Sequence, residues 1–513
     1  MSLHVGRSTA VALWGTQGTP IAIEASINSG LPGIDVVGLP DTSVNEAKKR
    51  VRASVANLGF AMSAQRITVN LSPASVKKYG TNFDLGIAVA ILQAERRIPQ
   101  ATDRVVFCAE LGLDSRLHPV NGVVPTLIAA KQAGLTTVVV SQANEKEARM
   151  LTGLNVISAN SLGEVVNHFG GDVQVPQLPP VERHATKAGK PLSVNDLSQV
   201  QGQDEARYAL EVAAAGGHHI LMIGSPGAGK TMLAGCLPGL LPALSEEQAI
   251  ETFSLRSIDG TLNPEHGLDT TPPFEAPHHS TTSAAMVGGS KPTSIGVFSR
   301  AHRGVLFMDE APEFHRDVLE ALRQPLENSR CEIGRAWGTV TLPAEFQLVL
   351  AANPCPCGSA VGDGKACRCT PIAKRRYRDR LSGPLLDRID IQMDMLPLSA
   401  ADVHAREVRE CTADVAVRVA EARRIQASRY EGQAWSTNAR APGSWLRALF
   451  AFTPQETAPL DSAMDRGDLT MRGYDRIVRI ATTVADLGGR ERPTGDDLAV
   501  SYTHLTLPTK RIV

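Results

Sequence analysis

Apolar and polar positions follow different periods in successive parts of the chain. Between residue 1 and about residue 170, strand-like runs such as PIAIEASI, RITVNL and TTVVV alternate with helical stretches such as SVNEAKKRVRASVANLG. Residues 196–398 again alternate apolar strands with helices, and residues 399–500 show mainly the helical period. This pattern predicts an α/β fold with a helical C-terminal part.

Two stretches interrupt the periodic pattern. Residues 172–195 contain four prolines and no apolar period, which indicates a linker. The predicted domains are therefore residues 1–171, 196–398 and 399–500. The last thirteen residues, SYTHLTLPTKRIV (501–513), depart from the helical pattern before them. We interpret them as a disordered tail or as sequence that is not native, because similar strings arise by translation of sequencing adapters.

Composition and charge narrow the function classes. The chain has 513 residues, of which 43% are hydrophobic, and a formal net charge of -1. A strongly basic field for nucleic acid is absent, so any contact with DNA has to be local. We find no leader and no run of 18 apolar residues, and therefore expect a cytoplasmic protein without membrane contact.

A glycine-rich loop between an apolar strand and a helix gives the strongest chemical signal. The stretch HHILMIGSPGAGKTMLAGCLPGLL (218–241) fits G-x-x-x-x-G-K-[ST] from Gly224 to Thr231. In such a loop, backbone N–H groups face phosphates at the N-terminus of a helix. Lys230 is expected to reach the β- and γ-phosphates of ATP, and Thr231 to hold Mg²⁺. The other predicted ATP-binding residues of the loop are Ser225, Pro226, Gly227, Ala228 and Gly229.

Two more apolar strands end in polar residues that suit ATP hydrolysis. GVLFMDE (304–310) ends in Asp309, which is expected to bind Mg²⁺, and Glu310, which is expected to polarise the attacking water as a general base. FQLVLAANP (346–354) places the amide of Asn353 where it can orient that water or a γ-phosphate oxygen. A strand-terminal asparagine in a simple turn is the alternative.

The order and spacing of these motifs resemble an AAA+ P-loop ATPase. The resemblance makes Asn353 the sensor 1 residue. The stretch VQGQDEARYAL (200–210) resembles the segment that backs the adenine, with Gly202 and Gln203 at its turn.

Two arginines complete the AAA+ resemblance. LSGPLLDRID (381–390) resembles the arginine-finger segment, with Arg388 reaching the γ-phosphate of a neighbouring subunit. MRGYDRIVRIA (471–481) resembles the sensor 2 helix, with Arg472 as the contact. An arginine supplied by a neighbour implies an oligomer, which in this class is usually a hexameric ring. Solvated surface charges are the alternative for both residues.

Two insertions resemble those of the AAA+ subgroup that includes replicative helicases and magnesium chelatase motors. EAPHHSTTSAAMVGG (275–289) resembles the helix-2 insert, and CEIGRAWGTVTLPAEF (331–346) resembles the pre-sensor-1 hairpin. In helicases of that subgroup both line a central pore and grip DNA. The corresponding candidates for phosphate contact and base stacking are His278, His279, Arg335 and Trp337. Alternatively, the two histidines are ordinary polar residues of a loop, and the tryptophan packs at a domain interface.

Nearly the whole chain, from residue 1 to about residue 500, resembles the ComM/YifB family of magnesium chelatase-like ATPases. The resemblance is carried by stretches such as SGLPGIDVVGLPDTSVNEAKKRVRASVANLGF (29–60), EAPHHSTTSAAMVGGS (275–290) and ANPCPCG (352–358). It implies a hexameric, ATP-driven motor that acts on single-stranded or branched DNA and assists branch migration in transformation or recombination. The alternatives are a chelatase-type motor that remodels a protein partner, and an ATP-gated scaffold.

Residues 1–171 resemble the proteolytic domain of Lon. Such a domain needs a nucleophilic serine and a lysine base within hydrogen-bond reach. In NFDLG (82–86), Asp84 stands where the family pattern has the serine, and Val124 takes the place of the lysine. A carboxylate and a valine cannot form this dyad, so protease activity is not expected.

Two Cys-x-Cys pairs follow Asn353 in NPCPCGSAVGDGKACRCT (353–370). The four residues are Cys355, Cys357, Cys367 and Cys369. Folded back across the glycine-rich loop, the pairs can place four thiolates around one structural Zn²⁺. Reduced thiols and disulfides are the alternatives, and a cytosolic protein disfavours disulfides. The adjacent basic segment AKRRYRDR (373–380) either contacts phosphates or is a solvated face.

Overall fold

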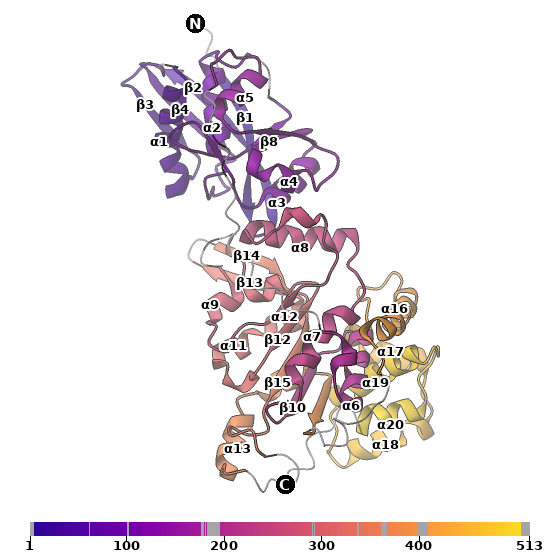
Figure 1. The fold of residues 1–513 in the computed structure, drawn as a ribbon. Helices are drawn as coiled ribbons and strands as arrows, with labels where there is room; N and C mark the ends of the chain where they lie inside the picture. The colour runs from indigo at the N-terminus through magenta and orange to yellow at the C-terminus, as the bar shows by residue number, and fades with distance from the viewer. Residues whose placement is uncertain are drawn as a thin grey trace.

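The computed structural model describes most of the chain. The described residues are 5–60, 62–99, 102–175, 179, 181, 195–289, 291, 293–335, 338–360, 367–397 and 409–503. Figure 1 shows an elongated molecule in which an N-terminal sheet unit stands on a second α/β unit, with a group of helices beside the second unit. The expected mixed α/β fold with a parallel-sheet core is confirmed.

The N-terminal unit is built on a seven-stranded mixed sheet in the order β3-β4-β2-β1-β5-β8-β9. β1 and β2 form a long antiparallel hairpin, whereas β5, β8 and β9 continue the sheet in parallel. In β4 every second residue is buried, which is the period of a strand covered on one face. The strands are β1 (Val5–Trp14), β2 (Gln17–Asn28), β3 (Gly33–Val37), β4 (Arg66–Ser72), β5 (Val105–Cys108), β8 (Thr137–Ser141) and β9 (Asn155–Ala159).

Helices cover both faces of this sheet. One face packs against α1 (Thr42–Asn57), α2 (Asp84–Ala94) and α5 (Leu162–His168). The other face packs against α3 (Val123–Gln132) and α4 (Glu145–Ala148). The two apolar clusters are separate, and each lies between the sheet and one helical layer.

The two positions of the Lon dyad lie in different surroundings. Asp84 is fully buried and accepts hydrogen bonds from the Arg50 guanidinium and, at 3.3 Å, from the backbone N–H of Leu111. Burial raises the pKa of the Asp84 carboxyl to about 6. Val124 instead packs against Phe253 of the second unit. The position of the Lon serine is therefore taken by a carboxylate in a buried ion pair, and the position of the lysine by an apolar side chain.

The second unit has a five-stranded, fully parallel sheet in the order β11-β12-β15-β10-β16. Alternate residues of β12 and β15 enter apolar clusters on opposite faces, as a parallel sheet with both faces covered requires. One face packs against α6 (Asp204–Gly216) and α7 (Lys230–Leu240). The strands are β10 (Ile220–Gly224), β11 (Phe274–Glu275), β12 (Val305–Met308), β15 (Gln347–Ala352) and β16 (Ile391–Met395).

The opposite face of the parallel sheet carries shorter helices. They are α9 (Ser283–Val287), α10 (Val297–Arg300), α11 (Arg316–Ala321), α12 (Arg323–Asn328) and α14 (Gly383–Leu386). These helices and the sheet enclose the apolar cluster that includes Phe298 and Leu350.

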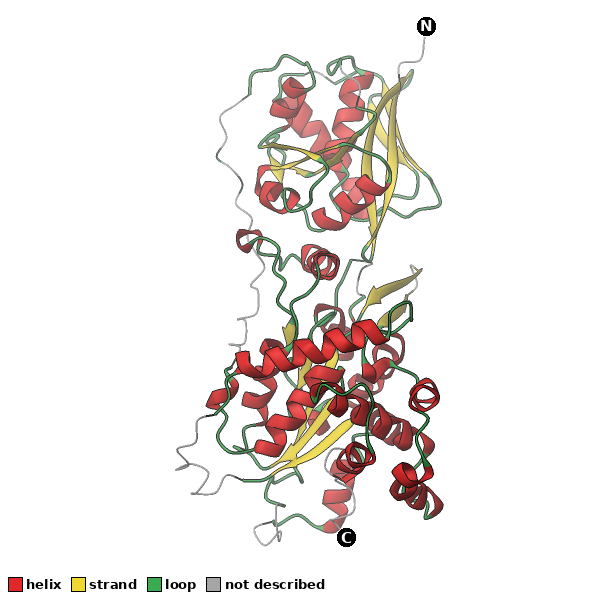
Figure 2. Cartoon of the chain, turned by 90° about the vertical axis from the view of Figure 1, so that its right-hand side faces the viewer, coloured by secondary structure: helices red, strands yellow, loops and turns green. Residues whose placement is uncertain are grey.

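The N-terminal unit rests on α8 (Glu246–Asp259) and on the hairpin of β13 (Arg330–Arg335) and β14 (Gly338–Pro343). Trp14 packs into the apolar cluster of this hairpin and donates a hydrogen bond from Nε1 to the Thr339 carbonyl at 2.9 Å. Figure 2 shows the two sheets one above the other along the long axis of the molecule. The hairpin therefore lies beneath the N-terminal sheet and touches it.

The C-terminal helices pack beside α6. They are α16 (Thr412–Arg429), α17 (Gly443–Phe450), α18 (Pro454–Asp465), α19 (Met471–Leu487) and α20 (Gly495–Thr503). α16 and α19 contribute to the same apolar cluster as α6 and the parallel sheet. The long amphipathic period of α19 accounts for this packing, since its buried residues recur every three or four positions.

Of the tail predicted for residues 501–513, the structure describes residues 501–503 alone, and these are helical. Helix α20 continues through Thr503, and Ser501 is buried. The threonine-rich sequence lowered the expected helical propensity, but tertiary packing decides this last turn. Residues 504–513 and most of the expected linker, 172–195, lie outside the described residues. Among the described helices, none is long and apolar enough to cross a membrane.

Candidate functional site

The parallel sheet brings the predicted ATP-binding residues to one edge. The register pairs Ile223 of β10 with Ala352 of β15, and Met308 of β12 with Leu350. β15 therefore ends two residues beyond the end of β12, and β10 ends one residue beyond the end of β15, so these three neighbouring strands end within about three residues of each other. The polar residues that follow them come together at the carboxyl edge of the sheet, where parallel α/β sheets bind ligands.

Lys230 connects the glycine-rich loop with Asn353. Its Nζ donates to the carbonyl of Gly224 at 2.7 Å, to the carbonyl of Ser225 at 2.9 Å and to Oδ1 of Asn353 at 3.2 Å. Burial lowers the pKa of Lys230, and the nearby carboxylates Asp309 and Glu310 oppose this effect. No carboxylate of the described residues forms an ion pair with this ammonium, so its charge is left for an anion.

Thr231 and Asp309 form the second contact between the loop and the sheet edge. The Thr231 hydroxyl donates to Oδ2 of Asp309 at 2.8 Å, and the other carboxylate oxygen accepts the backbone N–H of Glu310 at 2.9 Å. A hydroxyl and a carboxylate at this distance are hard oxygen ligands of the kind that Mg²⁺ prefers. Both could hold the ion with a bound nucleotide.

Glu310 lies in the left-handed backbone region, with φ +52°, and its side chain is about half exposed. Nδ1 of His279 lies 3.2 Å from Oε2 of Glu310. His278 stacks on His279, with 4.0 Å between the ring centroids. The two histidines therefore lie at the predicted general base, a position that spacing alone did not reveal. Their occurrence as a pair in EAPHHS was the available signal.

The glycine-rich loop has the open backbone that phosphate binding requires. Gly227 and Gly229 have φ values of +82° and +90°, and a Cβ at either position would meet no atom within 4 Å. The peptide groups thus border free space on the outer side. At Gly224 a Cβ would lie 2.8 Å from the carbonyl of Met395, so the strand end itself excludes a side chain.

Gly202 and Gln203 turn the chain into α6 with φ values of +57° and +58°. The Gln203 side chain donates to the carbonyl of Leu396 at 2.6 Å, directly after β16. Because β16 and β10 pair in parallel and end together, this turn lies at the same sheet edge as the glycine-rich loop.

Arg388 and Arg472 lie together at the opposite edge of the sheet. Arg388 precedes β16, whose Ile391 is level with Ile220 at the start of β10. Arg472 forms an ion pair with Asp387 at 3.5 Å. Five residues of β10 span about 16 Å, so neither arginine approaches the glycine-rich loop of its own chain.

Arg388 lies among other cations. It forms an ion pair with Glu327, whereas burial and the neighbouring cations Arg323 and Arg472 lower its pKa. Arg323 and Arg472 also have carboxylate partners, Glu320 and Asp387.

The four cysteines form one cluster. Their Sγ atoms all lie within 4.8 Å of one another. The distances from Cys355 to Cys357 and Cys367 are 3.3 and 3.6 Å, and Cys357 lies 3.8 Å from Cys367. A tetrahedral Zn²⁺ with Zn–S bonds of about 2.3 Å requires S···S distances of about 3.8 Å, so the thiols fit this ion. A hydrogen bond from the backbone of Ser359 helps to lower the pKa of Cys357 to about 5, which favours a thiolate.

The cysteine loop contacts the nucleotide site. Gly358 packs so closely on Pro226 that a Cβ on the glycine would lie 2.6 Å from the proline Cδ. After the cysteines, α13 (Pro371–Arg378) places buried Tyr377 close to the backbone of Asn353. The local spacing of these residues was visible in the sequence, but these two contacts were not predicted.

The predicted pore residues are only partly described. His278 and His279 lie beside Glu310 and not on the hairpin. Arg335 ends β13, but its side chain is not described, and Trp337 lies outside the described residues.

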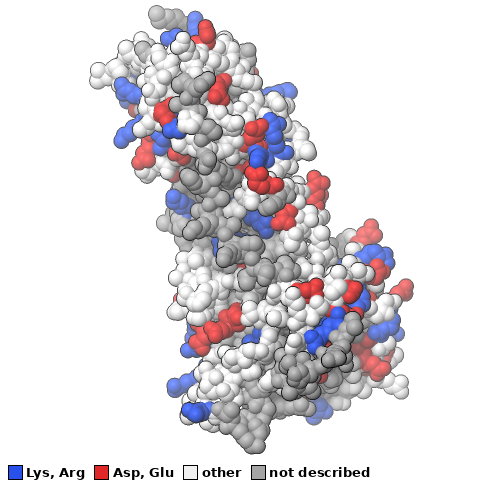
Figure 3. All heavy atoms as spheres, viewed as in Figure 1, with Lys and Arg blue, Asp and Glu red and all other residues white. Residues whose placement is uncertain are grey.

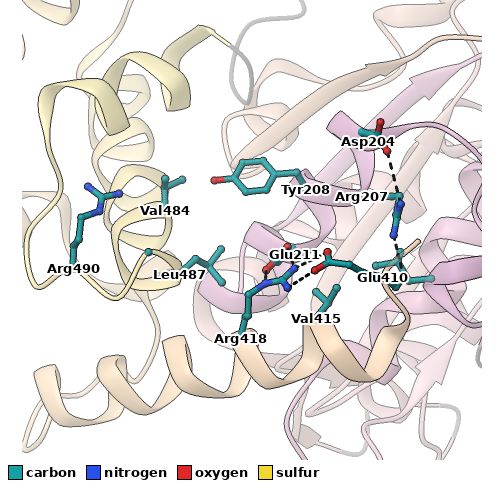
Figure 4. Close-up of a pocket in the computed structure, with 12 residues that line it drawn as sticks. Asp204, Arg207, Tyr208, Glu211, Glu410, Val415, Arg418, Val484, Leu487 and Arg490 are labelled. Carbon is teal, nitrogen blue, oxygen red and sulfur yellow. Dashed lines mark hydrogen bonds and ion pairs between the residues drawn. The ribbon is translucent and has the colours of Figure 1, made fainter. Parts of the chain in front are cut away.

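A pocket of about 530 Å³ lies between α6, α16 and α19. Figure 4 shows Arg418 between two carboxylates on its floor, with Tyr208 and Arg490 on opposite sides. Arg418 donates to Glu211 at 2.6 Å and to Glu410 at 2.6 Å. The charge of Arg418 is therefore balanced within the chain. The pocket lies where the C-terminal helices pack on α6, and no residue of the glycine-rich loop lines it.

Three protein-family models match the chain in succession. The model described as magnesium chelatase, subunit ChlI, matches residues 196–403. A model of subunit ChlI of Mg-chelatase matches residues 23–144, and a model of the ChlI C-terminal part matches residues 409–503.

Similar proteins match over nearly their whole length. An uncharacterized protein of Mycobacterium tuberculosis is 44% identical over 503 residues, which are 98% of both chains. The competence protein ComM of Haemophilus influenzae is 38% identical over 495 residues, 96% of this chain and 95% of the relative. YifB of Escherichia coli is 36% identical over 513 residues, 98% of this chain and 97% of the relative.

A shorter similarity concerns Lon. The Lon protease of Geobacter metallireducens is 28% identical over 175 residues, which are 32% of this chain and 21% of the relative. This likeness supports the Lon-like interpretation of part of the chain. The serine–lysine dyad is replaced there by Asp84 and Val124.

The role predicted for Glu310 can be tested by removing its charge alone. Glu310→Gln leaves the Thr231–Asp309 contact in place, so ATP binding is expected to persist. ATP turnover at saturating ATP is expected to fall by about 10²- to 10⁴-fold, the usual contribution of a general base. Phosphate release and nucleotide binding are the two measurements. Glu247→Gln on α8 is the matched control and should keep wild-type turnover; near-normal turnover in Glu310→Gln would assign the base to another group.

The cysteine cluster predicts a metal content. Purified wild-type protein is expected to contain about one zinc per chain by elemental analysis, because four thiolates complete a tetrahedral site. The double variant Cys355→Ser/Cys367→Ser should lose the zinc, whereas Cys411→Ser, outside the cluster, should keep it. Four freely titrating thiols and no zinc in the wild type would contradict this assignment.

Proposed function

The chain belongs to the ComM/YifB family of magnesium chelatase-like proteins, and from this membership we propose that it is an ATP-hydrolysing motor that acts on DNA. The family supports an AAA+ ATPase. The observation that carries the proposal is the convergence of Lys230 with Asn353 and of Thr231 with Asp309 at one sheet edge.

Each of these side chains has a part in hydrolysis. The N–H groups of the glycine-rich loop bind the phosphates, and Lys230 exchanges its carbonyl partners for phosphate oxygens. Thr231 and Asp309 would hold Mg²⁺, which would supply positive charge to offset the phosphates. Glu310 accepts a proton from the attacking water, and Asn353 orients that water or the γ-phosphate.

Two neighbouring features support this site. His279, 3.2 Å from Glu310, holds the carboxylate in position for the water. The four cysteines bind one Zn²⁺ that fixes the loop behind Pro226 and the start of α13. The zinc has a structural role under this proposal, because all four ligand positions are filled by protein.

The separation of the two groups of site residues supports a ring. Lys230 and Glu310 lie at the carboxyl edge of the sheet, whereas Arg388 and Arg472 lie at the amino edge. In a head-to-tail ring the amino edge of one subunit meets the carboxyl edge of the next. Arg388 and Arg472 then reach the γ-phosphate held by the neighbour, and a homo-hexamer is the closed form that we propose.

DNA is the proposed substrate of the motor. The relative described as competence protein ComM is 38% identical over nearly its whole length, and we extend a role in competence, with DNA as the substrate, to this chain. The β13–β14 hairpin and the segment 275–289 serve as the pre-sensor-1 hairpin and the helix-2 insert that face the pore of the ring. The motor would drive branch migration on single-stranded or branched DNA during transformation or recombination.

A second candidate is favoured by the family models themselves. All three are described as parts of the magnesium chelatase subunit ChlI, which supports a motor that remodels a protein partner. ATP turnover that responds to no form of DNA would favour this function, or an ATP-gated scaffold, over the DNA motor.

The proposed arginine in trans predicts complementation between two inactive variants. Lys230→Ala and Arg388→Ala are each expected to have little ATP turnover. In a 1:1 mixture, about a quarter of the interfaces of a random ring combine an intact loop with an intact finger. Turnover per chain is therefore expected to recover partly on mixing, measured by phosphate release. Purely additive turnover of the mixture would contradict an arginine that acts across the interface.

The proposed substrate predicts that DNA changes ATP turnover. Single-stranded and forked DNA are expected to raise the rate of phosphate release, and Lys230→Ala is expected to abolish the response together with the basal rate. A synthetic four-way junction reports branch migration in the same preparation. If no form of DNA is bound or alters turnover, the DNA motor is wrong.

A further inference from the structure

Helix α13 exposes positive charge that the described residues neutralise only in part. Lys374, Arg376 and Arg378 form no ion pair with any residue that the structure describes. Arg375 has one such contact, with Asp379 at 3.7 Å, and both side chains are largely exposed, at 84% and 67%. An exposed pair of this kind contributes little free energy, so it leaves Arg375 available.

Several arginines on another helix are, in contrast, paired with carboxylates. On α16, Arg418 is held by two carboxylates, Arg424 pairs with Glu421, and Arg429 pairs with Asp486. The whole chain has a net charge of -1, and Figure 3 shows basic and acidic atoms interspersed over much of this face. The positive charge on α13 is therefore a local feature of the kind that a phosphate backbone requires.

Both ends of α13 are anchored. Thr370, directly after Cys369 of the cysteine cluster, accepts the backbone N–H of Ala373 and caps the helix. At the other end, Arg380 donates to the carbonyl of Pro312 at 3.0 Å and pairs with Glu313 at 2.7 Å. These contacts hold the short helix in one orientation, which lowers the entropy cost of binding a ligand.

The inner side of α13 contacts the ATP site. Tyr377 is buried close to the backbone of Asn353, whose side chain accepts a hydrogen bond from Lys230 at 3.2 Å. Figure 1 places α13 at the end of the molecule remote from the N-terminal sheet, below the ends of β10 and β15. Between a ligand on the outer side of the helix and Lys230 there are thus only two residues in space, Tyr377 and Asn353.

We propose that α13 binds the phosphate backbone of single-stranded DNA, and that Tyr377 and Asn353 transmit this contact to the ATP site. The proposal rests on the proposed DNA motor and adds a contact outside the hairpin and insert. The helix has eight residues and is about 12 Å long, enough for two or three phosphates of an extended strand. Its outer side has guanidinium groups and no exposed aromatic ring, so it would bind the phosphates of the strand and would not distinguish base sequence.

The test compares two triple variants with the same change in charge. Lys374→Gln/Arg376→Gln/Arg378→Gln removes three cations from α13 and keeps good helix formers. Lys48→Gln/Lys49→Gln/Arg52→Gln does the same on α1 of the N-terminal unit. Binding of a fluorescent oligothymidylate is measured over a series of salt concentrations, with the oligomeric state and the zinc content of each protein as folding controls.

The α13 variant is expected to bind the oligonucleotide about tenfold more weakly or worse at low salt. The slope of log K against log salt should decrease by about 2, the value for three phosphate contacts on a single strand. The ratio of ATP turnover with and without DNA should fall as well, whereas the α1 variant should match the wild type in every measurement.

Other outcomes overturn the proposal. Wild-type affinity and salt slope in the α13 variant would show that the helix is a solvated face. Loss of binding only together with loss of the ring would make α13 a subunit contact. If wild-type protein itself binds no DNA, the proposed DNA motor fails, a result distinct from an unaffected α13 variant in a wild-type background that does bind.

Discussion

The parallel register of β10, β12 and β15 is the constraint on which the site depends. All strands of this sheet point the same way, so every loop that follows a strand lies at one edge and every loop that precedes a strand lies at the other. Lys230, Asp309 and Asn353 belong to the first group, and Arg388 belongs to the second. A single chain therefore holds these two groups of residues at opposite edges of its sheet.

The nucleotide loop is held by contacts that do not involve a ligand. The Lys230 ammonium is stabilised by two carbonyls and one amide, which leaves its charge uncompensated in a buried place. Gly358 of the cysteine loop packs on Pro226 from outside, and buried Tyr377 of α13 lies close to the backbone of Asn353. The cysteine loop and α13 therefore both border the glycine-rich loop and the strand end at Asn353.

The N-terminal unit carries a buried ion pair and is joined to the second unit by packing contacts. Its Asp84 is held in a buried ion pair with Arg50, and its Val124 packs against Phe253 of the sheet unit. Trp14 ties the same unit to the β13–β14 hairpin. The ion pair and the apolar contact are compatible with a rigid support for the hairpin, and a carboxylate beside an arginine is no nucleophile.

The sequence alone was enough to predict the family and the α/β class. It also predicted the residues of the glycine-rich loop, Asp309 and Asn353, because each of these signals is a short apolar run followed directly by polar residues. It also determined the four cysteines as a cluster, since they lie within fifteen residues. Only the tertiary structure decided the contacts of His279 with Glu310, of Asp387 with Arg472 and of Trp14 with Thr339. These partners are separated by about 30 to more than 300 residues along the chain, and local periodicity has no information on such pairs; they arise when strands and helices pack. The last turn of α20 was missed for the same reason, because burial of Ser501 outweighs the low helical propensity of its neighbours.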